Sequence, residues 1–167
     1  MMRLLASALF VLSVSGPASA DGPASAGAGN VVLVHGGTTD GSGWKDVFHI
    51  LRAKGLAVTV VALPHTSLED DIAATRLAVD VQSGPTVLVG HSYGGAVITE
   101  AGVAPNVKAL VYVAALQPDK GESLAEISSR FPMGIDSKML DDERFVPSRA
   151  SYHEMIGADL PRDVTDF

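Results

Sequence analysis

The segment TVLVGHSYGG, residues 86–95, joins an apolar run to a G-x-S-x-G motif, and it is the most informative part of the chain. Its first half predicts a buried strand, and a helix is predicted at 94–102. A serine on such a sharp turn presents its hydroxyl freely, and the residues two before and two after it must be small because neighbouring chain passes close by. Gly90 and Gly94 meet this requirement, which makes Ser92 the candidate nucleophile. The alternative is a glycine-rich turn with an incidental serine.

A second motif follows the β-branched run 30–34 and consists of four residues: His35, Gly36, Gly37 and Thr38. Acyl transfer needs two backbone N–H donors for the oxyanion, one from the residue after the nucleophile and one from a glycine-rich loop after an earlier strand. Tyr93 is the candidate for the first donor. Thr38 is the candidate for the second, and Gly37 is the neighbour that could take its role. We expect His35 to orient this loop by hydrogen bonds rather than to act as a base.

The chain alternates apolar runs with segments of helical periodicity. Four strands are predicted, at 30–34, 57–63, 86–89 and 107–115. The helices between them are indicated by the apolar spacing of 44–51, by the capping-box-like Ser67 with Asp70 three residues later, and by 94–102. This order predicts an α/β fold with a parallel sheet and right-handed crossovers. Because the strands are apolar throughout, we expect helices on both faces of the sheet.

Four segments of different character predict the domain organisation. They are a signal peptide at 1–20, a flexible lead-in at 21–29, an α/β core at 30–118, and a cap segment at 119–167. The cap segment is much richer in charged residues than the core and carries scattered large apolar residues. It is interpreted as helical pieces without a clear strand, lying over another part of the protein.

The first twenty residues have the plan of a secretory signal peptide: Arg3, an apolar run at 4–14, and an A-x-A site at 18–20. The apolar run is too short for a membrane span. A second A-x-A at 24–26 leaves the cleavage position open, and an uncleaved N-terminal anchor is the alternative. We therefore expect an exported protein, periplasmic or secreted, with no stable membrane anchor after cleavage.

Composition limits the function classes. Hydrophobic residues make up 47% of the chain and charged residues 19%, as in a globular protein. The net charge of −7 argues against a nucleic-acid partner. There is no cysteine, the five histidines form no metal-binding motif, and neither a dinucleotide-binding G-x-G-x-x-G nor a P-loop is present. The sequence therefore predicts neither a metal nor a cofactor.

Four stretches, VVLVHGG, DGSGW, LVGHSYGGAV and VYVAALQPD, together resemble the α/β-hydrolase superfamily. They look closest to the small single-domain esterases related to plant methylesterases and hydroxynitrile lyases, over residues 30–119. The resemblance implies Ser92 as nucleophile, Thr38 and Tyr93 as oxyanion donors, and the segment after Pro118 as a cap over the pocket. It also implies that the strand at 30–34 lies between the second and third predicted strands. The expected function is hydrolysis of small apolar esters without a cofactor.

One departure from the family pattern concerns the catalytic acid and histidine. In the family they follow the serine, beyond the cap and two further strands, whereas this chain stops at Phe167. We therefore expect a C-terminally truncated chain whose own activity is open, and a non-catalytic relic or binding module is the alternative. A substitute triad of Ser92, Asp119 and His153 keeps the family order but is not expected, because cap residues are poorly fixed relative to the sheet. Lyase or peroxidase-type chemistry on the same fold also stays open. Substrate identity and oligomeric state are not determined by the sequence.

Overall fold

The computed structural model describes residues 29–130, 134, 136–141 and 144–166. The predicted signal peptide at 1–20 and the predicted lead-in as far as residue 28 lie outside the described residues. No helix in the described ranges is long and apolar enough to cross a membrane.

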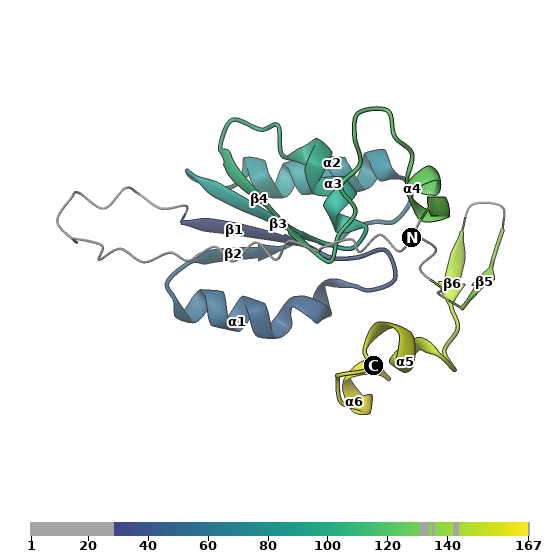
Figure 1. The fold of residues 1–167 in the computed structure, drawn as a ribbon. Helices are drawn as coiled ribbons and strands as arrows, with labels where there is room; N and C mark the ends of the chain where they lie inside the picture. The colour runs from purple at the N-terminus through teal and green to yellow at the C-terminus, as the bar shows by residue number, and fades with distance from the viewer. Residues whose placement is uncertain (1–28, 131–133, 135, 142–143, 167) are drawn as a thin grey trace, which may run out of the picture.

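A parallel sheet of four strands forms the centre of the protein (Figure 1). The strands are β1 (Asn30–Val34), β2 (Ala57–Val60), β3 (Thr86–His91) and β4 (Val107–Val113). Their order, β2-β1-β3-β4, confirms the order that the family resemblance implies. The ends differ slightly: β2 and β4 stop before residues 63 and 115, and β3 runs two residues past 89, because its backbone pairs with β4 as far as His91.

Helices cover both faces of the sheet, as expected (Figure 1). The short 3-10 helix η1 (Gly41–Trp44) and α1 (Lys45–Ala53) lie on one face, and α2 (Leu68–Asp80) and α3 (Gly94–Ala101) lie on the other. Local signals set the helix ends. The Ser67 side chain accepts a hydrogen bond from the Asp70 N–H at 3.1 Å, which caps α2. Gly55, at φ +85°, turns the chain out of α1 in a conformation that glycine adopts without strain.

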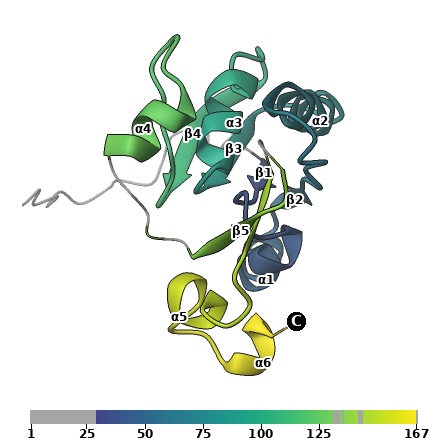
Figure 2. The ribbon, with the colours of Figure 1, turned by 90° about the vertical axis from the view of Figure 1, so that its right-hand side faces the viewer.

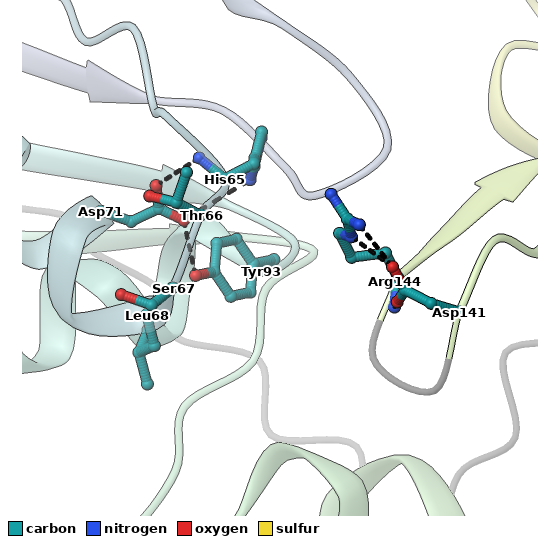
Figure 3. Close-up of a pocket in the computed structure, with 8 residues that line it drawn as sticks. All are labelled: His65, Thr66, Ser67, Leu68, Asp71, Tyr93, Asp141 and Arg144. Carbon is teal, nitrogen blue, oxygen red and sulfur yellow. Dashed lines mark hydrogen bonds and ion pairs between the residues drawn. The ribbon is translucent and has the colours of Figure 1, made fainter.

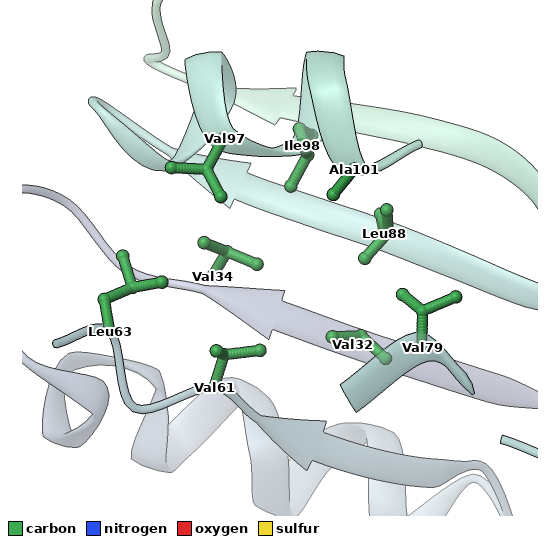
Figure 4. Close-up of a cluster of buried hydrophobic side chains, with 9 residues drawn as sticks. All are labelled: Val32, Val34, Val61, Leu63, Val79, Leu88, Val97, Ile98 and Ala101. Atoms are coloured by element: carbon green, nitrogen blue, oxygen red, sulfur yellow. The ribbon is translucent and has the colours of Figure 1, made fainter. Parts of the chain in front are cut away.

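The larger core cluster lies between the sheet and helices α2 and α3 (Figure 4). Its buried members are Val32, Val34, Val61, Leu63, Val79, Leu88, Val97, Ile98 and Ala101. A smaller cluster of Val31, Leu33 and Trp44 fills the opposite face under α1. Adjacent residues of β1 alternate between the two clusters, so that β1 is buried on both faces. This explains why its sequence is apolar throughout.

Strand β4 lies at the edge of the sheet, and its α1 side is less covered than the sequence predicts. Val111 and Val113 pair with Val89 and His91 of β3, which face the α1 side. Their side chains are 42% and 41% exposed, whereas Leu110 and Tyr112 on the other side pack against the larger cluster. The expectation of helices over both faces therefore holds for β1 but not for β4, because α1 does not reach the outer strand.

The segment after Pro118 consists of short elements beyond the carboxyl ends of the core strands (Figures 1 and 2). They are α4 (Leu124–Arg130), β5 (Ser137–Met139), β6 (Phe145–Pro147), α5 (Tyr152–Ile156) and α6 (Arg162–Thr165). The expectation of helical pieces without a strand is wrong here, since β5 and β6 form an antiparallel ribbon. Strands of three residues are too short to show a periodicity in the sequence. Their pairing depends on contacts at the turn, where the Leu140 N–H donates to the Arg144 carbonyl at 2.8 Å.

Burial of the core predicts a clear difference between two leucines. Leu88→Ala removes a fully buried side chain and should lower the free energy of unfolding by about 2–5 kcal/mol. Leu77→Ala changes a side chain that is 68% exposed and should shift it by no more than about 0.5 kcal/mol. Urea denaturation of both variants measures the difference, and equal losses would contradict the described core.

Candidate active site

Ser92 occupies the turn between β3 and α3 with φ at 52°, a left-handed conformation that is uncommon outside glycine. Such a conformation costs about 1–3 kcal/mol unless surrounding contacts hold it. Its backbone is held on both sides: the Ser92 N–H donates to the Val113 carbonyl at 3.3 Å, and the Ser92 carbonyl accepts from the N–H groups of Gly95 and Leu116, each at 3.0 Å. The turn is therefore fixed by its own helix and by the end of β4.

The glycines around Ser92 are required by close backbone contacts. A Cβ atom on Gly90 would lie 2.5 Å from the Gly94 carbonyl oxygen, and one on Gly94 would lie 2.6 Å from the His35 carbonyl oxygen. A Cβ atom on Gly95 would lie 2.3 Å from the Leu116 carbonyl oxygen. No side chain fits at these three positions without movement of the backbone.

The loop of His35, Gly36, Gly37 and Thr38 lies directly against this turn. A Cβ atom on Gly36 would be 3.1 Å from Ser92 Cβ, and one on Gly37 would be 3.5 Å from Tyr93 Cβ. In the described part of the chain, the N–H groups of Gly37, Thr38 and Tyr93 donate no hydrogen bond to another residue. The geometry therefore brings Gly36 and the alternative donor residue Gly37 against the nucleophile turn, of which Tyr93 is a part, and Thr38 follows directly in the same loop.

His35 is buried and bridges two loops at the carboxyl edge of the sheet. Its Nε2 accepts from the Leu63 N–H at 3.3 Å, which leaves the proton on Nδ1, 3.0 Å from the Gly36 carbonyl. Both ring nitrogens are thus occupied by backbone groups. This arrangement fits the orienting role expected for His35 rather than that of a base.

The Tyr93 side chain extends from the nucleophile turn to α2 (Figure 3). Its phenol donates to Asp71 Oδ2 at 2.7 Å. Burial raises the pKa of the Tyr93 phenol above its ordinary value, and the hydrogen bond to Asp71 and the charge of that carboxylate raise it further. Tyr93 therefore stays protonated and serves as a hydrogen-bond donor over the whole range in which the protein would work.

Helix α5 of the cap contacts the candidate oxyanion loop. The Tyr152 phenol donates to the Thr38 carbonyl at 2.9 Å. Burial raises the pKa of Tyr152, and the charge of Asp40 adds to the effect, so the phenol remains a donor. A cavity of about 850 Å³ lies between this loop and helices α5 and α6, and its lining also includes His91 and His153. The cap segment is thus connected to the loop beside Ser92.

Two histidines could be considered as a base for Ser92: His91, which precedes it in the chain, and His153, a member of the substitute triad. Both make contacts with other residues. The His91 ring projects to the α1 side and meets Trp44 edge-on with ring centroids 6.3 Å apart, and burial lowers its pKa. His153 Nδ1 pairs with Thr165 Oγ1 at 2.8 Å. Asp119 is exposed, and its backbone N–H and carbonyl are both hydrogen-bonded to Glu122. Among the described residues no hydrogen bond joins the Ser92 hydroxyl to Asp119 or His153, so the structure does not bring the substitute triad together.

The residues that the structure describes include no group of three or more histidine, aspartate or glutamate side chains that could hold a metal ion.

Two residues beside the site were not identified from the sequence, Asp71 and Tyr152. Asp71 is hidden in a run of three acidic residues at 69–71, which is normally a solvated first turn of a helix. A weak signal exists, because Asp71 is four and eight residues before the buried Thr75 and Val79 and so lies on the buried face of α2. Tyr152 has no such signal, since its partner lies 114 residues earlier in the chain.

Comparison with known proteins gives a consistent result. The profile described as "Alpha/beta hydrolase family" matches residues 31–166. A curated relative, the carbendazim hydrolyzing esterase of Nocardioides sp. (strain SG-4G), is 31% identical over 135 residues, which cover 67% of this chain and 56% of the relative. This chain therefore spans a little over half the length of that relative.

Solved structures show the same fold. Polyneuridine aldehyde esterase superposes with a TM-score of 0.67 and 21% identity, over 81% of this chain and 64% of that one. A pyrethroid hydrolase from Sphingobium faniae JZ-2 superposes with a TM-score of 0.61 and 22% identity, over 79% of this chain and 62% of that one. At these identities the likeness concerns the fold alone.

The contacts of Gly94 predict that this position does not tolerate a methyl group. Gly94→Ala places Cβ against the carbonyl oxygens of His35 and Val34, at 2.6 and 2.7 Å, and should cost about 1–3 kcal/mol of stability. Gly43→Ala is the control, because nothing lies within 4 Å of its Cβ position. Thermal unfolding of both variants checks this, and an unchanged melting temperature for Gly94→Ala would be inconsistent with the described turn.

The bond between Tyr152 and Thr38 predicts that α5 is held on the core partly by one phenol. Tyr152→Phe should lose about 0.5–1.5 kcal/mol of local stability and speed amide hydrogen exchange in 151–157 by up to about tenfold. Tyr112→Phe is the matched control, since it removes a phenol that bonds Thr99 at 2.9 Å within the core. Exchange in 151–157 that responds equally to both variants would argue against the tether.

Proposed function

The chain belongs to the alpha/beta hydrolase family, and from this premise we propose that it acts as a serine esterase with Ser92 as the nucleophile. The observation that carries the proposal is the strained Ser92 turn, with φ at 52°, lying against a glycine loop. Such strain persists only where the surrounding structure holds it, and it is concentrated at functional sites. Placement of the serine between a strand and a helix also directs helical N–H groups toward the reacting atoms.

In the proposed reaction the Ser92 oxygen attacks the acyl carbon of the ester and gives up its proton to a general base. The carbonyl oxygen becomes an oxyanion, which accepts hydrogen bonds from the N–H groups of Tyr93 and Thr38. Collapse of this intermediate, with return of the proton from the base to the leaving oxygen, expels the alcohol and leaves an acyl group on Ser92, which water then removes as the carboxylic acid. The family resemblance implies a histidine as the base, because a serine hydroxyl is a weak nucleophile without one.

The proposed substrates are small apolar esters. Support comes from the curated relative, which is named an esterase, and from apolar side chains such as Ile156, Leu160 and Val164 that line the cavity beside Thr38. An exported location, periplasmic or secreted, is proposed from the signal-peptide pattern of residues 1–20 alone. No cofactor is required by this chemistry.

Covalent labelling of Ser92 tests the proposal. In the full-length protein, a fluorophosphonate probe should form an adduct on the tryptic peptide that contains Ser92, and Ser92→Ala should abolish it. Ser42→Ala is the matched control, because Ser42 is exposed and lines the cavity beside Thr38. Mass spectrometry of the intact protein and of its peptides measures the adduct.

Two results would contradict the assignment. Labelling that survives in Ser92→Ala would place the reactive group elsewhere. A folded, full-length wild-type protein that takes no label would favour the non-catalytic binding module over the esterase.

A further inference from the structure

We propose that Asp71 is a positioning residue for the proposed esterase reaction, acting through Tyr93 on the backbone N–H that receives the oxyanion. The inference rests on the proposed function, because it assigns a role to a contact of the same site. Asp71 itself does not touch the reacting atoms. It binds the phenol of Tyr93, the residue whose backbone N–H is proposed to receive the oxyanion.

Asp71 is a buried carboxylate with every oxygen in use. Its exposed fraction is 1%, and an isolated charge at such a position would be strongly unfavourable. Oδ1 accepts from the His65 N–H at 2.8 Å, and Oδ2 accepts from the Tyr93 phenol at 2.7 Å, with His65 Nδ1 3.5 Å from Oδ2. Its position in the first turn of α2 adds the favourable helix dipole. The carboxylate is thus stabilised without a lysine or arginine partner among the described residues.

The partners of Asp71 lie on loops at the catalytic edge of the sheet (Figure 3). Tyr93 follows the nucleophile directly. His65 lies in the loop after β2 with φ at 54°, a left-handed conformation that the bond from its N–H to Asp71 holds in place. The His65 ring meets the His35 ring edge-on at 5.2 Å, and His35 bonds Gly36 of the candidate oxyanion loop. One carboxylate therefore connects both sources of oxyanion donors.

The direction of the Tyr93 N–H depends on how the whole residue is held. Ser92 and Tyr93 share the peptide group that carries this N–H, and Tyr93 lies just before α3, where no side chain caps the helix. The Tyr93 side chain is bounded by Gly37 near Cβ and by Asp71 at the phenol oxygen. With both ends fixed, rotation of the residue would break a short, charge-assisted hydrogen bond.

A polar network is not what stability alone would favour at this place. Well-packed apolar side chains can be as stabilising as a buried charged group. A satisfied polar network instead selects one arrangement, because any other leaves a buried charge without partners. An oxyanion donor needs such precision, since removing one typically costs 10²–10³-fold in rate.

Asp71→Asn and Tyr93→Phe test the proposal. Asparagine keeps the shape of Asp71 but has one oxygen and one NH2 group in place of two oxygens, so it cannot accept from both the phenol and the His65 N–H as Asp71 does, and it removes the charge that strengthens the bond to the phenol. Each variant should lower the maximal rate of fluorophosphonate labelling at Ser92 by about tenfold or more, with little change in the probe concentration for half-maximal rate. Asp80→Asn, at the exposed end of the same helix, is the matched control and should label like the wild type.

The double variant Asp71→Asn/Tyr93→Phe separates positioning from general stability. If Asp71 acts through Tyr93, the double variant should label no more slowly than Tyr93→Phe alone. Two results would overturn the proposal: a double variant in which the rate losses of the two single variants multiply, or an Asp71→Asn variant that labels at the wild-type rate. Melting curves of each variant show that the comparison is made between folded proteins.

A second measurement does not depend on activity. In ¹H–¹⁵N NMR spectra, the amide resonance of residue 93 should move in the same direction in Asp71→Asn and Tyr93→Phe. It should stay in place in Asp80→Asn. An unmoved Tyr93 amide in Asp71→Asn would overturn the positioning role even if the wild type takes no label. Failure of wild-type labelling with a moved amide would count against the esterase, whereas the influence of Asp71 on the Tyr93 amide, through the phenol that Asp71 binds, would still be established.

Discussion

The left-handed backbone at Ser92 is the constraint on which the rest of the site depends. It is held by three backbone hydrogen bonds that reach the end of β4 and the start of α3. Because the chain turns so sharply, Gly90, Gly94 and Gly95 meet backbone atoms at distances that exclude a side chain. The same sharpness brings the loop after β1 into contact with the serine. The left-handed backbone of Ser92, the requirement for glycine around it and the position of the loop after β1 are thus all consequences of one turn.

Two tyrosine phenols connect this turn to other parts of the protein. Tyr93 reaches across to the buried carboxylate of Asp71 in α2, and Tyr152 reaches from the cap segment to the carbonyl of Thr38. Burial raises the pKa of both phenols, so each remains a donor. The two residues with candidate oxyanion N–H groups are therefore each held by a contact far from the nucleophile in sequence. Precision at the site depends on helices that carry no reacting group.

The sheet is unevenly covered, and this affects how the site is supported. Strand β1 is buried between two helical layers, whereas β4 exposes Val111 and Val113 on the α1 side. The end of β4 nevertheless supplies the carbonyl of Val113, and the loop after it supplies the N–H of Leu116, and both groups hold Ser92. The nucleophile turn thus lies between the loop after β1, the best-buried strand, and the end of β4, whose α1 side is the least covered.

The sequence alone determined the parallel sheet, the capped start of α2 and the serine turn, because each depends on local patterns: apolar runs, a capping serine and glycines at fixed spacing. It also led to the family through those motifs, and the strand order followed from the resemblance to that family. Only the tertiary structure decided that Asp71 is buried and bonded to Tyr93, that Tyr152 reaches Thr38, and that Asp119 and His153 do not join Ser92. These facts depend on residues 22 to 114 positions apart. No local pattern specifies such pairs, since they arise when helices and loops pack in three dimensions.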